Sequence, residues 1–505
     1  MTAATTNPRI LIVTPEITHL PADMGNMASQ LTAKAGGLAD VSAALVGALF
    51  DQGADVHVAL PHYRQMFHVD IGKLIAEELR VYQNKLPSSR IHLAEDRIFY
   101  YRDAVYSSDA KENPKIALAF QREVINNIIP LVKPDLIHCN DWMTGLIPAM
   151  ARRLNIPCLL TLHNIHTYKI PLAQVEDRGI DAAGFWQHLF FERTPYNYEE
   201  SRATNQVDLL TSGIFAAHFI NTVSPTFLLE VANGQHAFVP EQIRREVALK
   251  LQAGCAVGIL NAPDPIYNPA IDPMLPVNFT AETHPEAKKE CKRRLQQQLG
   301  LRVNDRAPIF FWPSRLDPVQ KGCQLLADIL YRVVADYAHE ELQIVFVANG
   351  PFKQHFRNIV QLHAMYDRVA VCNFREEISR LAYAASDFML MPSLFEPCGL
   401  PQMISCLYGS LPVVRDTGGL HDTVNHLDAS RGTGNGFVFE TYDANGLRWA
   451  VDQAMDFHRQ PEEIKERQIR RIMTESTRRF NHGNTAQQYI DIYEKMLQRP
   501  LINAF

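Results

Sequence analysis

Short apolar runs alternate with amphipathic segments along most of this chain, and this alternation limits the fold more than any other feature of the sequence. Ten β-branched or apolar runs of strand length lie between turn residues, at 10–13, 55–60, 136–138, 158–162, 219–222, 309–312, 343–347, 369–372, 388–391 and 411–414. The segments between them, among them 38–52, 144–154 and 378–385, carry apolar residues at helical spacing. Strands that alternate with helices are typical of parallel βαβ units, so the sequence predicts an α/β protein.

A cluster of prolines interrupts the alternation between residues 262 and 286. Because proline cannot continue a helix or a central strand, we expect the domain boundary there. The sequence predicts an N-terminal domain over residues 1–265, a second domain over 266–480 and a C-terminal segment, 481–505, that packs back on the N-terminal domain. Both domains are expected to be doubly wound and Rossmann-like and to face each other across a cleft, with ligands beyond the carboxyl ends of the strands.

The composition excludes several classes of protein. The 505 residues include 49 Lys and Arg against 55 Asp and Glu, and a net charge of −6 provides no basic excess for a nucleic-acid backbone. No run reaches the ~18 apolar residues of a membrane span, and the polar start of the chain is unlike a secretory or transit signal. The eight cysteines form no C-x-x-C pair, which argues against a disulfide framework or a zinc site. These features predict a cytoplasmic protein with no nucleic-acid and no membrane partner.

Two glycine pairs stand where amphipathic segments begin, and they predict phosphate binding. Backbone N–H groups at the start of a helix can bind anion oxygens, and a nearby lysine adds positive charge. Either pair alone is more often an ordinary turn, because neither matches a dinucleotide-binding or Walker fingerprint. The two groups are Lys34, Gly36 and Gly37 in the first half, and Thr417, Gly418 and Gly419 in the second.

Charged side chains follow two predicted strands of the second half. Arg315 and Lys321 lie in one loop after the run 309–312, where two cations could neutralise a diphosphate leaving group. Glu396, in the loop after 388–391, could hydrogen-bond the hydroxyls of a sugar. No Asp-x-Asp pair stands at a strand end, so the sequence predicts neither a metal site nor a cofactor.

Asp141 and His163 end neighbouring predicted strands of the first half. An acid and an imidazole in adjacent loops are typical of a polar pocket, although a structural histidine is an equally good interpretation. Cys398, beside Glu396, is interpreted as a small packing residue, since no Cys–His–acid grouping accompanies it.

Nine motifs follow one another along the chain in a specific order. They are Lys34-x-Gly-Gly-Leu-x-Asp-Val, His138-x-Asn-Asp-Trp, Thr161-Leu-His-Asn, Thr222-Val-Ser-Pro, Gly258-Ile-Leu-Asn, Ser314-Arg-Leu, Gln320-Lys-Gly, Phe395-Glu-Pro-Cys-Gly-Leu and Thr417-Gly-Gly-Leu. This set resembles the bacterial glycogen synthases and plant starch synthases of glycosyltransferase family five, from residue 10 to about residue 495. The resemblance implies a GT-B fold and the transfer of glucose from ADP-glucose to the non-reducing 4-hydroxyl of an α-1,4-glucan, with retained configuration.

The resemblance also implies roles for individual residues. Arg315 and Lys321 would neutralise the diphosphate, and Glu396 would hold glucose hydroxyls. His163 would line the donor sugar and lend its carbonyl to the developing oxocarbenium, and Asp141 would lie beside the reacting centre. The residues expected to bind the nucleotide sugar are Lys34, Gly36, Gly37, Asn261, Phe374, Cys398, Gly399, Leu400, Thr417, Gly418 and Gly419.

The chain departs from the family pattern at several positions. Ala262 and Pro263 stand where Gly-Ile is common, and Phe374 stands where a tyrosine usually stacks on the nucleobase. Ile404 replaces another tyrosine, and Leu394 replaces an arginine. These changes keep two alternatives open: a relative that uses UDP-glucose or another acceptor, and a non-catalytic binder of glucan or sugar nucleotide.

Two further segments carry expectations. Six aromatic residues lie within 185–198; the phenylalanines are expected to pack a helix onto the sheet, and Trp186, Tyr196 and Tyr198 are expected to line a groove for the acceptor glucan. The basic segment 286–299 is interpreted as a helix with a solvated charged face.

Overall fold

The chain divides into two units, which the computed structural model describes over residues 7–25, 28–68 and 89–502. Unit 1 comprises the described parts of Met1–Val223, Leu228–Ile259 and His482–Phe505, and unit 2 comprises Ser224–Phe227 and Leu260–Asn481. The division therefore falls just before the proline-rich stretch 262–286. That stretch is packed as part of unit 2.

Side chains from the proline-rich stretch explain why the boundary precedes it. Asp272 is fully buried and accepts a hydrogen bond from the Tyr408 hydroxyl at 2.5 Å and from the Arg380 guanidinium at 3.4 Å. Leu275 and Phe279 are buried in the same apolar cluster of unit 2. Prolines here end regular structure without making a linker, because the side chains between them are anchored in the core.

Unit 1 is built on a seven-stranded parallel sheet in the order β3-β2-β1-β4-β5-β8-β9. The strands are β1 (Arg9–Val13), β2 (Asp55–Pro61), β3 (Ile91–Ala94), β4 (Leu136–Asn140), β5 (Cys158–Leu162), β8 (Phe219–Thr222) and β9 (Ala256–Gly258). The strand order reverses direction between β1 and β4. In a doubly wound sheet, the loops that follow the strands at this switch point form the ligand crevice.

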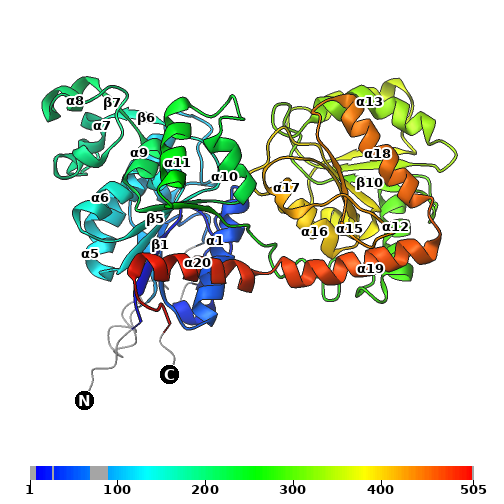
Figure 1. Cartoon of the computed structure of the whole chain (residues 1–505), viewed down its shortest axis with the longest axis horizontal. Helices are drawn as coiled ribbons and strands as arrows, with labels where there is room; N and C mark the ends of the chain where they lie inside the picture. Colours follow the sequence, from blue (N-terminus) through cyan, green and yellow to red (C-terminus); the bar gives the residue numbers. More distant parts are fainter. Residues whose placement is uncertain (1–6, 26–27, 69–88, 503–505) are drawn as a thin grey trace, which may run out of the picture. The chain divides into compact units, whose positions relative to one another are not determined.

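Helices cover the sheet of unit 1, with α20 packed against α1 and α6 packed against α9 (Figure 1). The α-helices assigned to this unit are α1 (Gly37–Asp51), α3 (Arg97–Tyr100), α4 (Asn113–Glu123), α5 (Ile129–Val132), α6 (Ile147–Arg153), α7 (Leu172–Glu176), α8 (Tyr198–Thr204), α9 (Leu209–Ala216), α11 (Glu241–Gln252) and α20 (His482–Leu497). Helix α10 (Pro225–Ala232) starts in the segment assigned to unit 2 and ends in unit 1. Short 3-10 turns are η1 (Ala22–Met24), η2 (Ala28–Gln30), η4 (Trp142–Thr144), η5 (Ala182–Gly184) and η6 (Trp186–His188), and η3 (Val124–Ile128) is a π-turn.

Unit 2 contains a six-stranded parallel sheet in the order β12-β11-β10-β13-β14-β15. Its strands are β10 (Ile309–Trp312), β11 (Gln343–Val347), β12 (Val369–Cys372), β13 (Phe388–Met391), β14 (Leu411–Arg415) and β15 (Phe437–Phe439). Successive residues of the central strands enter two different apolar clusters: Phe310 and Trp312 lie in one, and Ile309 and Phe311 lie in the other. Both faces of the sheet are thus buried, which explains why its strands read as continuous apolar runs.

The helices of unit 2 flank this sheet (Figure 1). They are α12 (His284–Leu299), α13 (Cys323–Asp336), α14 (Lys353–Leu362), α15 (Glu376–Ala385), α16 (Pro401–Leu407), α17 (Gly418–Thr423), α18 (Ala444–His458) and α19 (Glu462–Arg479). Two doubly wound parallel sheets confirm the predicted α/β class. No helix among the described residues is long and apolar enough to cross a membrane.

The basic helix α12 corrects the prediction of a purely solvated face. Lys288 is buried, and its ammonium donates to the carbonyls of Ala384, Ser386 and Tyr408 at 2.8, 2.9 and 3.1 Å. Lys292, one turn later, is buried against the Asp387 carboxylate at 2.7 Å. The i, i+4 spacing places both cations on the packed face. The solvated interpretation holds for neighbours such as Lys289, which pairs with Glu286 in the same helix.

Residues 165–208 form an excursion from the unit 1 sheet around the short antiparallel pair β6 (Lys169–Pro171) and β7 (Gln206–Asp208). The aromatic segment 185–198 lies in this excursion as 3-10 turns and an isolated bridge from Phe191 to Val207. Phe185 and Phe191 are buried, as the sequence predicts, but the expectation that they pack a helix onto the sheet is wrong, because the segment around them forms 3-10 turns.

Candidate functional site

Glu16, three residues after the end of β1, holds the glycine turn that starts α1. Its carboxylate is buried, and one oxygen accepts the backbone N–H groups of Ala35 and Gly36 at 2.7 and 2.9 Å. The other oxygen accepts the Tyr106 hydroxyl at 3.0 Å. Sequence analysis left Glu16 without a role, and the structure shows that it fixes the turn on which the phosphate prediction rests.

The two glycines of this turn differ in what they offer to a ligand. Gly36 already donates its N–H to Glu16, so this amide is not free as the phosphate prediction requires. A Cβ added to Gly36 or Gly37 would meet open space, and neither residue has a positive φ. Since neither packing nor backbone conformation demands glycine here, the missing side chains leave room at the start of α1 for a molecule from outside the chain.

Lys34 lies across the same turn from Asp40. Its ammonium approaches the two oxygens of this carboxylate at 3.0 and 2.8 Å, and about half of the lysine side chain is exposed. An exposed ion pair of this kind contributes about 0–1 kcal/mol, so the lysine can exchange its partner for an incoming anion at little cost.

Asp141 and His163 lie together at the ends of β4 and β5. One Asp141 carboxylate oxygen accepts the His163 backbone N–H at 2.7 Å, and the other accepts the Asn164 side-chain amide at 2.8 Å. Burial raises the pKa of Asp141 to about 7, against the lowering effect of the His163 and Asn164 N–H groups. Asp141 also has a φ of 55°, a left-handed conformation that costs a non-glycine residue energy. Strain and burial together mark a residue held in place for a purpose beyond packing.

The His163 ring is fixed separately from its backbone. Its Nε2 atom lies 2.9 Å from the Asn140 side-chain oxygen, so the neutral ring donates to this amide. Burial lowers the pKa of His163 to about 3, which keeps the ring uncharged at neutral pH. An uncharged ring and a raised aspartate pKa make this end of unit 1 a low-dielectric polar pocket.

Aromatic rings lie next to this pocket. Trp142, which follows Asp141, packs its ring 4.7 Å from that of Tyr168 and 5.8 Å from that of His166. The Tyr168 hydroxyl accepts from the Asn113 amide at 3.3 Å. The Trp142 side chain is 2% exposed and is therefore packed in the interior, whereas Tyr168 is partly exposed.

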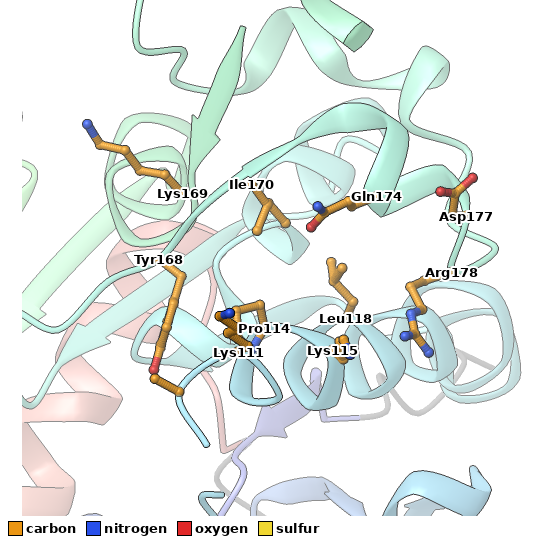
Figure 2. A pocket seen from close by; sticks show the side chains of 11 residues that line it. Lys111, Pro114, Lys115, Leu118, Tyr168, Lys169, Ile170, Gln174, Asp177 and Arg178 are labelled. Atoms are coloured by element: carbon orange, nitrogen blue, oxygen red, sulfur yellow. The ribbon is translucent and has the colours of Figure 1, made fainter. Parts of the chain in front are cut away.

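A surface hollow of about 590 Å³ opens beside Tyr168 (Figure 2). Leu118, Ile170 and Gln174 meet in it, while Lys169 extends its ammonium away from it, toward Glu192 at 3.0 Å (Figure 2). Its described lining is Ala110, Lys111, Pro114, Lys115, Leu118, Tyr168, Lys169, Ile170, Gln174, Asp177 and Arg178. The hollow shares no lining residue with the site predicted from sequence.

In unit 2, Lys321 and Glu396 form a buried ion pair. The Lys321 ammonium lies 2.5 Å from a Glu396 carboxylate oxygen, and the same oxygen accepts the Ser393 hydroxyl at 3.1 Å. Gly322, with a φ of 70°, follows the lysine, and a Cβ there would overlap the Pro392 carbonyl. Close backbone approach therefore brings the two loops together. Burial of a charged pair carries a desolvation cost, which indicates a functional use.

Three other predicted residues of unit 2 have side chains that make no hydrogen bond or ion pair with the described residues. Arg315 is exposed in the same loop as Lys321. Asn261 is buried, and its side-chain oxygen has no hydrogen-bond partner among the described residues. The Phe374 side chain is 47% exposed, while its N–H donates to the Asn349 side chain at 3.2 Å. Ser314, which sequence analysis quoted without a role, has a buried hydroxyl likewise unpartnered in the described chain.

The glycine-rich loops of unit 2 are explained largely by their own packing. The N–H of Gly419 donates to the Glu396 carbonyl at 2.9 Å, so the prediction that this amide is free for a diphosphate is wrong for this structure. A Cβ at Gly419 would overlap the Cys398 backbone, and Gly418 has a φ of 46°. Thr417 precedes α17 as its N-terminal cap residue.

The Cys398–Leu400 loop has the same structural character. Burial raises the pKa of the Cys398 thiol to about 12, which agrees with a packing residue. Gly399 has a φ of 71°, which favours glycine, and Leu400 precedes α16 at its N-terminal cap position. Ile404 is buried in the apolar core of unit 2.

The predicted acceptor aromatics separate into two kinds. Trp186 packs its ring 5.8 Å from that of Tyr198, whose hydroxyl is buried without a partner among the described residues. Tyr196 is 88% exposed. The prediction of one wet groove lined by all three therefore fits Tyr196 alone; Trp186 and Tyr198 are packed against each other.

Across residues 7–25, 28–68 and 89–502, no group of three or more His, Cys, Asp or Glu side chains is placed to hold a metal ion.

Comparison with known proteins finds two family models and several relatives that match this chain. A family model described as the starch synthase catalytic domain matches residues 9–245, and a model of glycosyl transferases group 1 matches residues 307–456. The glycogen synthase of Thermotoga petrophila is 32% identical over 92% of this chain and 97% of its own length. The glycogen synthase of Moorella thermoacetica is also 32% identical, over 97% of each chain.

Solved structures agree with the sequence relatives. The catalytic domain of starch synthase IV from Arabidopsis thaliana, bound to ADP and acarbose, superposes with a TM-score of 0.76 and 26% identity, over 98% of this chain and all of that one. Sucrose-phosphate synthase from Thermosynechococcus elongatus shares the fold, with a TM-score of 0.58 at 17% identity, over 97% of this chain and 99% of that one.

Proposed function

This chain belongs to the bacterial glycogen synthases and plant starch synthases of glycosyltransferase family five, which have the GT-B fold, and we propose that it transfers glucose from ADP-glucose to the non-reducing end of an α-1,4-glucan with retained configuration. Its relatives support a glucan-elongating glycosyltransferase over the whole chain. The observation that carries the ADP assignment is the similarity over 98% of this chain to a starch synthase whose structure contains ADP and acarbose.

The residues of unit 2 suit the leaving group. Lys321 is already desolvated beside Glu396, so a diphosphate that forms there meets a cation that needs little reorganisation. Arg315 adds a planar fork of donors, which matches phosphate oxygens better than a point charge does. The other oxygen of the Glu396 carboxylate accepts no hydrogen bond from the described residues, so it can accept sugar hydroxyls.

The residues of unit 1 suit the sugar as it becomes cationic. The anomeric carbon gains positive charge as its bond to the diphosphate breaks, and the His163 carbonyl and the Asp141 carboxylate would stabilise this charge. The neutral His163 ring avoids repulsion of the same charge. The 4-hydroxyl of the acceptor then bonds to the anomeric carbon, its proton leaves with the diphosphate, and the new glycosidic bond keeps the original configuration.

A comparison of the two donors tests this proposal. Purified protein should be given ADP-glucose or UDP-glucose at equal concentration with glycogen, and the released ADP or UDP should be measured. We expect kcat/KM to be at least about tenfold higher for ADP-glucose, a difference of about 1.4 kcal/mol. A preference for UDP-glucose would assign the chain to the alternative donor, and binding of glucan without transfer would identify a non-catalytic binder.

A further inference from the structure

A ring of buried hydrogen bonds, closed through the backbone of the C-terminal helix α20, joins this helix to three adjacent strands of unit 1. The Tyr493 hydroxyl lies 2.7 Å from His138 Nδ1 on β4, and His138 Nε2 lies 2.6 Å from the Thr161 hydroxyl on β5. The Thr161 hydroxyl lies 2.5 Å from the Asn221 side-chain oxygen on β8. The Asn221 amide nitrogen returns to α20 at the Tyr489 hydroxyl, 3.0 Å away.

Every donor in this ring can be assigned from the chemistry of its neighbours. The Asn221 amide nitrogen also faces the Thr222 carbonyl at 3.4 Å, which fixes the side-chain oxygen toward Thr161. Because an amide oxygen only accepts, the Thr161 hydroxyl donates to it and must accept from His138 Nε2–H. His138 Nδ1 is therefore unprotonated, and it accepts the proton of the Tyr493 hydroxyl.

The partners of His138 match a neutral imidazole that is protonated on Nε2. A proton on Nδ1 would face the Tyr493 hydroxyl and force it to give up its donor role. Burial lowers the pKa of His138 to about 3, so the neutral form persists across the physiological range. His138, Thr161, Asn221, Tyr489 and Tyr493 are all at most 1% exposed, so water cannot replace a lost partner.

The ring lies directly behind the loops of Asp141 and His163. His138 precedes Asp141 by three residues, and Thr161 precedes His163 by two. The Thr161 carbonyl accepts the Asp141 backbone N–H at 3.0 Å, and Thr161 pairs with Asn140 in the β4–β5 register. Asn140 in turn holds the His163 ring. A shift of the strands at His138 or Thr161 would therefore move both functional loops.

We propose that Tyr493, with Tyr489, is a positioning residue for glucosyl transfer: through His138 and Thr161 it fixes the ends of β4 and β5, and so the places of Asp141 and His163. This inference rests on the proposed function for the roles of these two residues. Because α20 also packs against α1, which begins at the Gly36–Gly37 turn, the same helix supports both parts of unit 1 that face the substrate.

The test begins with Tyr493→Phe, which removes the hydroxyl group and keeps the aromatic side chain. A reaction that depends on alignment loses rate when reacting groups move by a fraction of an ångström. We expect kcat to fall about tenfold, with the KM for the sugar nucleotide within about twofold of wild type. Tyr337→Phe is the matched control, because it removes a buried hydroxyl that donates to Asp452 in unit 2, at 2.5 Å. It should lower the melting temperature and leave kcat unchanged.

A second pair of variants separates positioning from stability. Thr161→Val removes the hydroxyl at nearly constant volume, whereas Thr161→Ser retains it. We expect Val to lower kcat as Tyr493→Phe does and Ser to restore at least half of the wild-type value. In the double variant Tyr493→Phe/Thr161→Val the two losses of kcat should not multiply, because both substitutions break the same ring of hydrogen bonds.

A measurement that does not use activity reports on the ring itself. Long-range 1H–15N spectra of the histidine imidazoles, with His138 assigned by His138→Gln, should show an unprotonated Nδ1 in the wild type and a changed Nδ1 resonance in Tyr493→Phe. A Tyr493→Phe protein whose kcat stays within twofold of wild type, with a melting temperature lowered as in Tyr337→Phe, overturns the proposal. Absence of transfer by the wild type would instead overturn the proposed function and leave the spectroscopic result standing.

Discussion

The Asp141 carboxylate accepts the backbone N–H of His163 at 2.7 Å, which joins the loops after two adjacent parallel strands. This bond helps to place an acid of raised pKa beside the carbonyl that faces the donor sugar in our account. The two positions are 22 residues apart in sequence, and the parallel pairing of β4 with β5 brings them together.

The raised pKa of Asp141 predicts the direction of the pH dependence. An acid with a pKa of about 7 is half protonated near neutrality, and only its ionised form can stabilise a positive anomeric carbon. We expect kcat/KM to rise with pH between about 6 and 8, and Asp141→Asn to be nearly inactive with no such rise. Initial rates in a buffer series measure this. A wild-type profile that is flat across this range would show that the ionisation of Asp141 does not matter.

The same shift predicts a stability effect of opposite sign. A folded pKa above the unfolded value of 3.8 means that the folded state holds the proton more tightly, so the contribution of Asp141 is favourable below pH ~4 and is lost as the pH rises through about 7. The melting temperature of Asp141→Asn minus that of the wild type should therefore be larger at pH 8 than at pH 5. Calorimetry at both values measures the change. An equal difference at the two pH values would contradict the burial of this acid.

The Lys321–Glu396 pair predicts non-additive stability. Glu396→Gln leaves a buried ammonium without its carboxylate, which typically costs about 3–5 kcal/mol, whereas Lys321→Met together with Glu396→Gln removes both charges. We expect the double variant to be more stable than the sum of the single changes predicts, by about 1 kcal/mol or more. Denaturant unfolding measures the cycle. Additive losses would place the two groups further apart than 2.5 Å in solution.

The leaving-group role of Arg315 and Lys321 predicts a loss of rate. Replacement of either residue by Ala should lower kcat/KM by ~10²-fold or more, since a charge-assisted contact to a developing diphosphate stabilises the transition state by several kcal/mol. The wild type should retain its activity in EDTA. Wild-type rates in both variants would remove the residues from the mechanism, and full loss of activity in EDTA would point to a required metal.

The exposed ring of Tyr196 predicts a selective effect on the acceptor. Tyr196→Ala should raise the KM for glycogen by about threefold or more and leave the KM for the sugar nucleotide within about twofold. Because Tyr196 is 88% exposed, the melting temperature of the Tyr196→Ala variant should equal that of the wild type. Tyr198→Ala is the control: it removes the ring packed on Trp186 and should lower the melting temperature. Equal rises of both KM values for Tyr196→Ala would show that the ring is not an acceptor contact.

Much of the fold could be predicted from apolar patterning because both sheets are buried on both faces. The runs 158–162, 219–222, 309–312, 343–347, 369–372 and 388–391 coincide with observed strands. Strands β3, β9 and β15 do not stand out in the sequence pattern; each lies at an edge of its sheet and is only partly buried. The proline-rich stretch, where the sequence predicts the domain boundary, belongs to unit 2, because the apolar and acidic residues between its prolines are anchored there.

The contacts within the candidate site could not be predicted from the sequence motifs. Motifs identified Lys321 and Glu396 separately, but their ion pair spans 75 residues and depends on the backbone contact of Gly322 with Pro392. Glu16 was overlooked because a carboxylate that holds a turn has no distinctive spacing in sequence. Lys288 is predicted to face solvent, because a charge in the sequence does not show that three backbone carbonyls lie beside it on the packed face of the helix.

Glucosyl transfer with analysis of the new bond tests the central claim most directly. Purified protein should be incubated with ADP-[14C]glucose and glycogen, and the labelled polymer should be digested with a β-amylase, which releases maltose from non-reducing α-1,4 ends. We predict label in glycogen that depends on the protein, is lost in Lys321→Ala, and is released almost entirely as maltose. Label that stays in ADP-glucose, or polymer label that resists β-amylase, would contradict the assignment of this chain as a retaining α-1,4-glucan synthase.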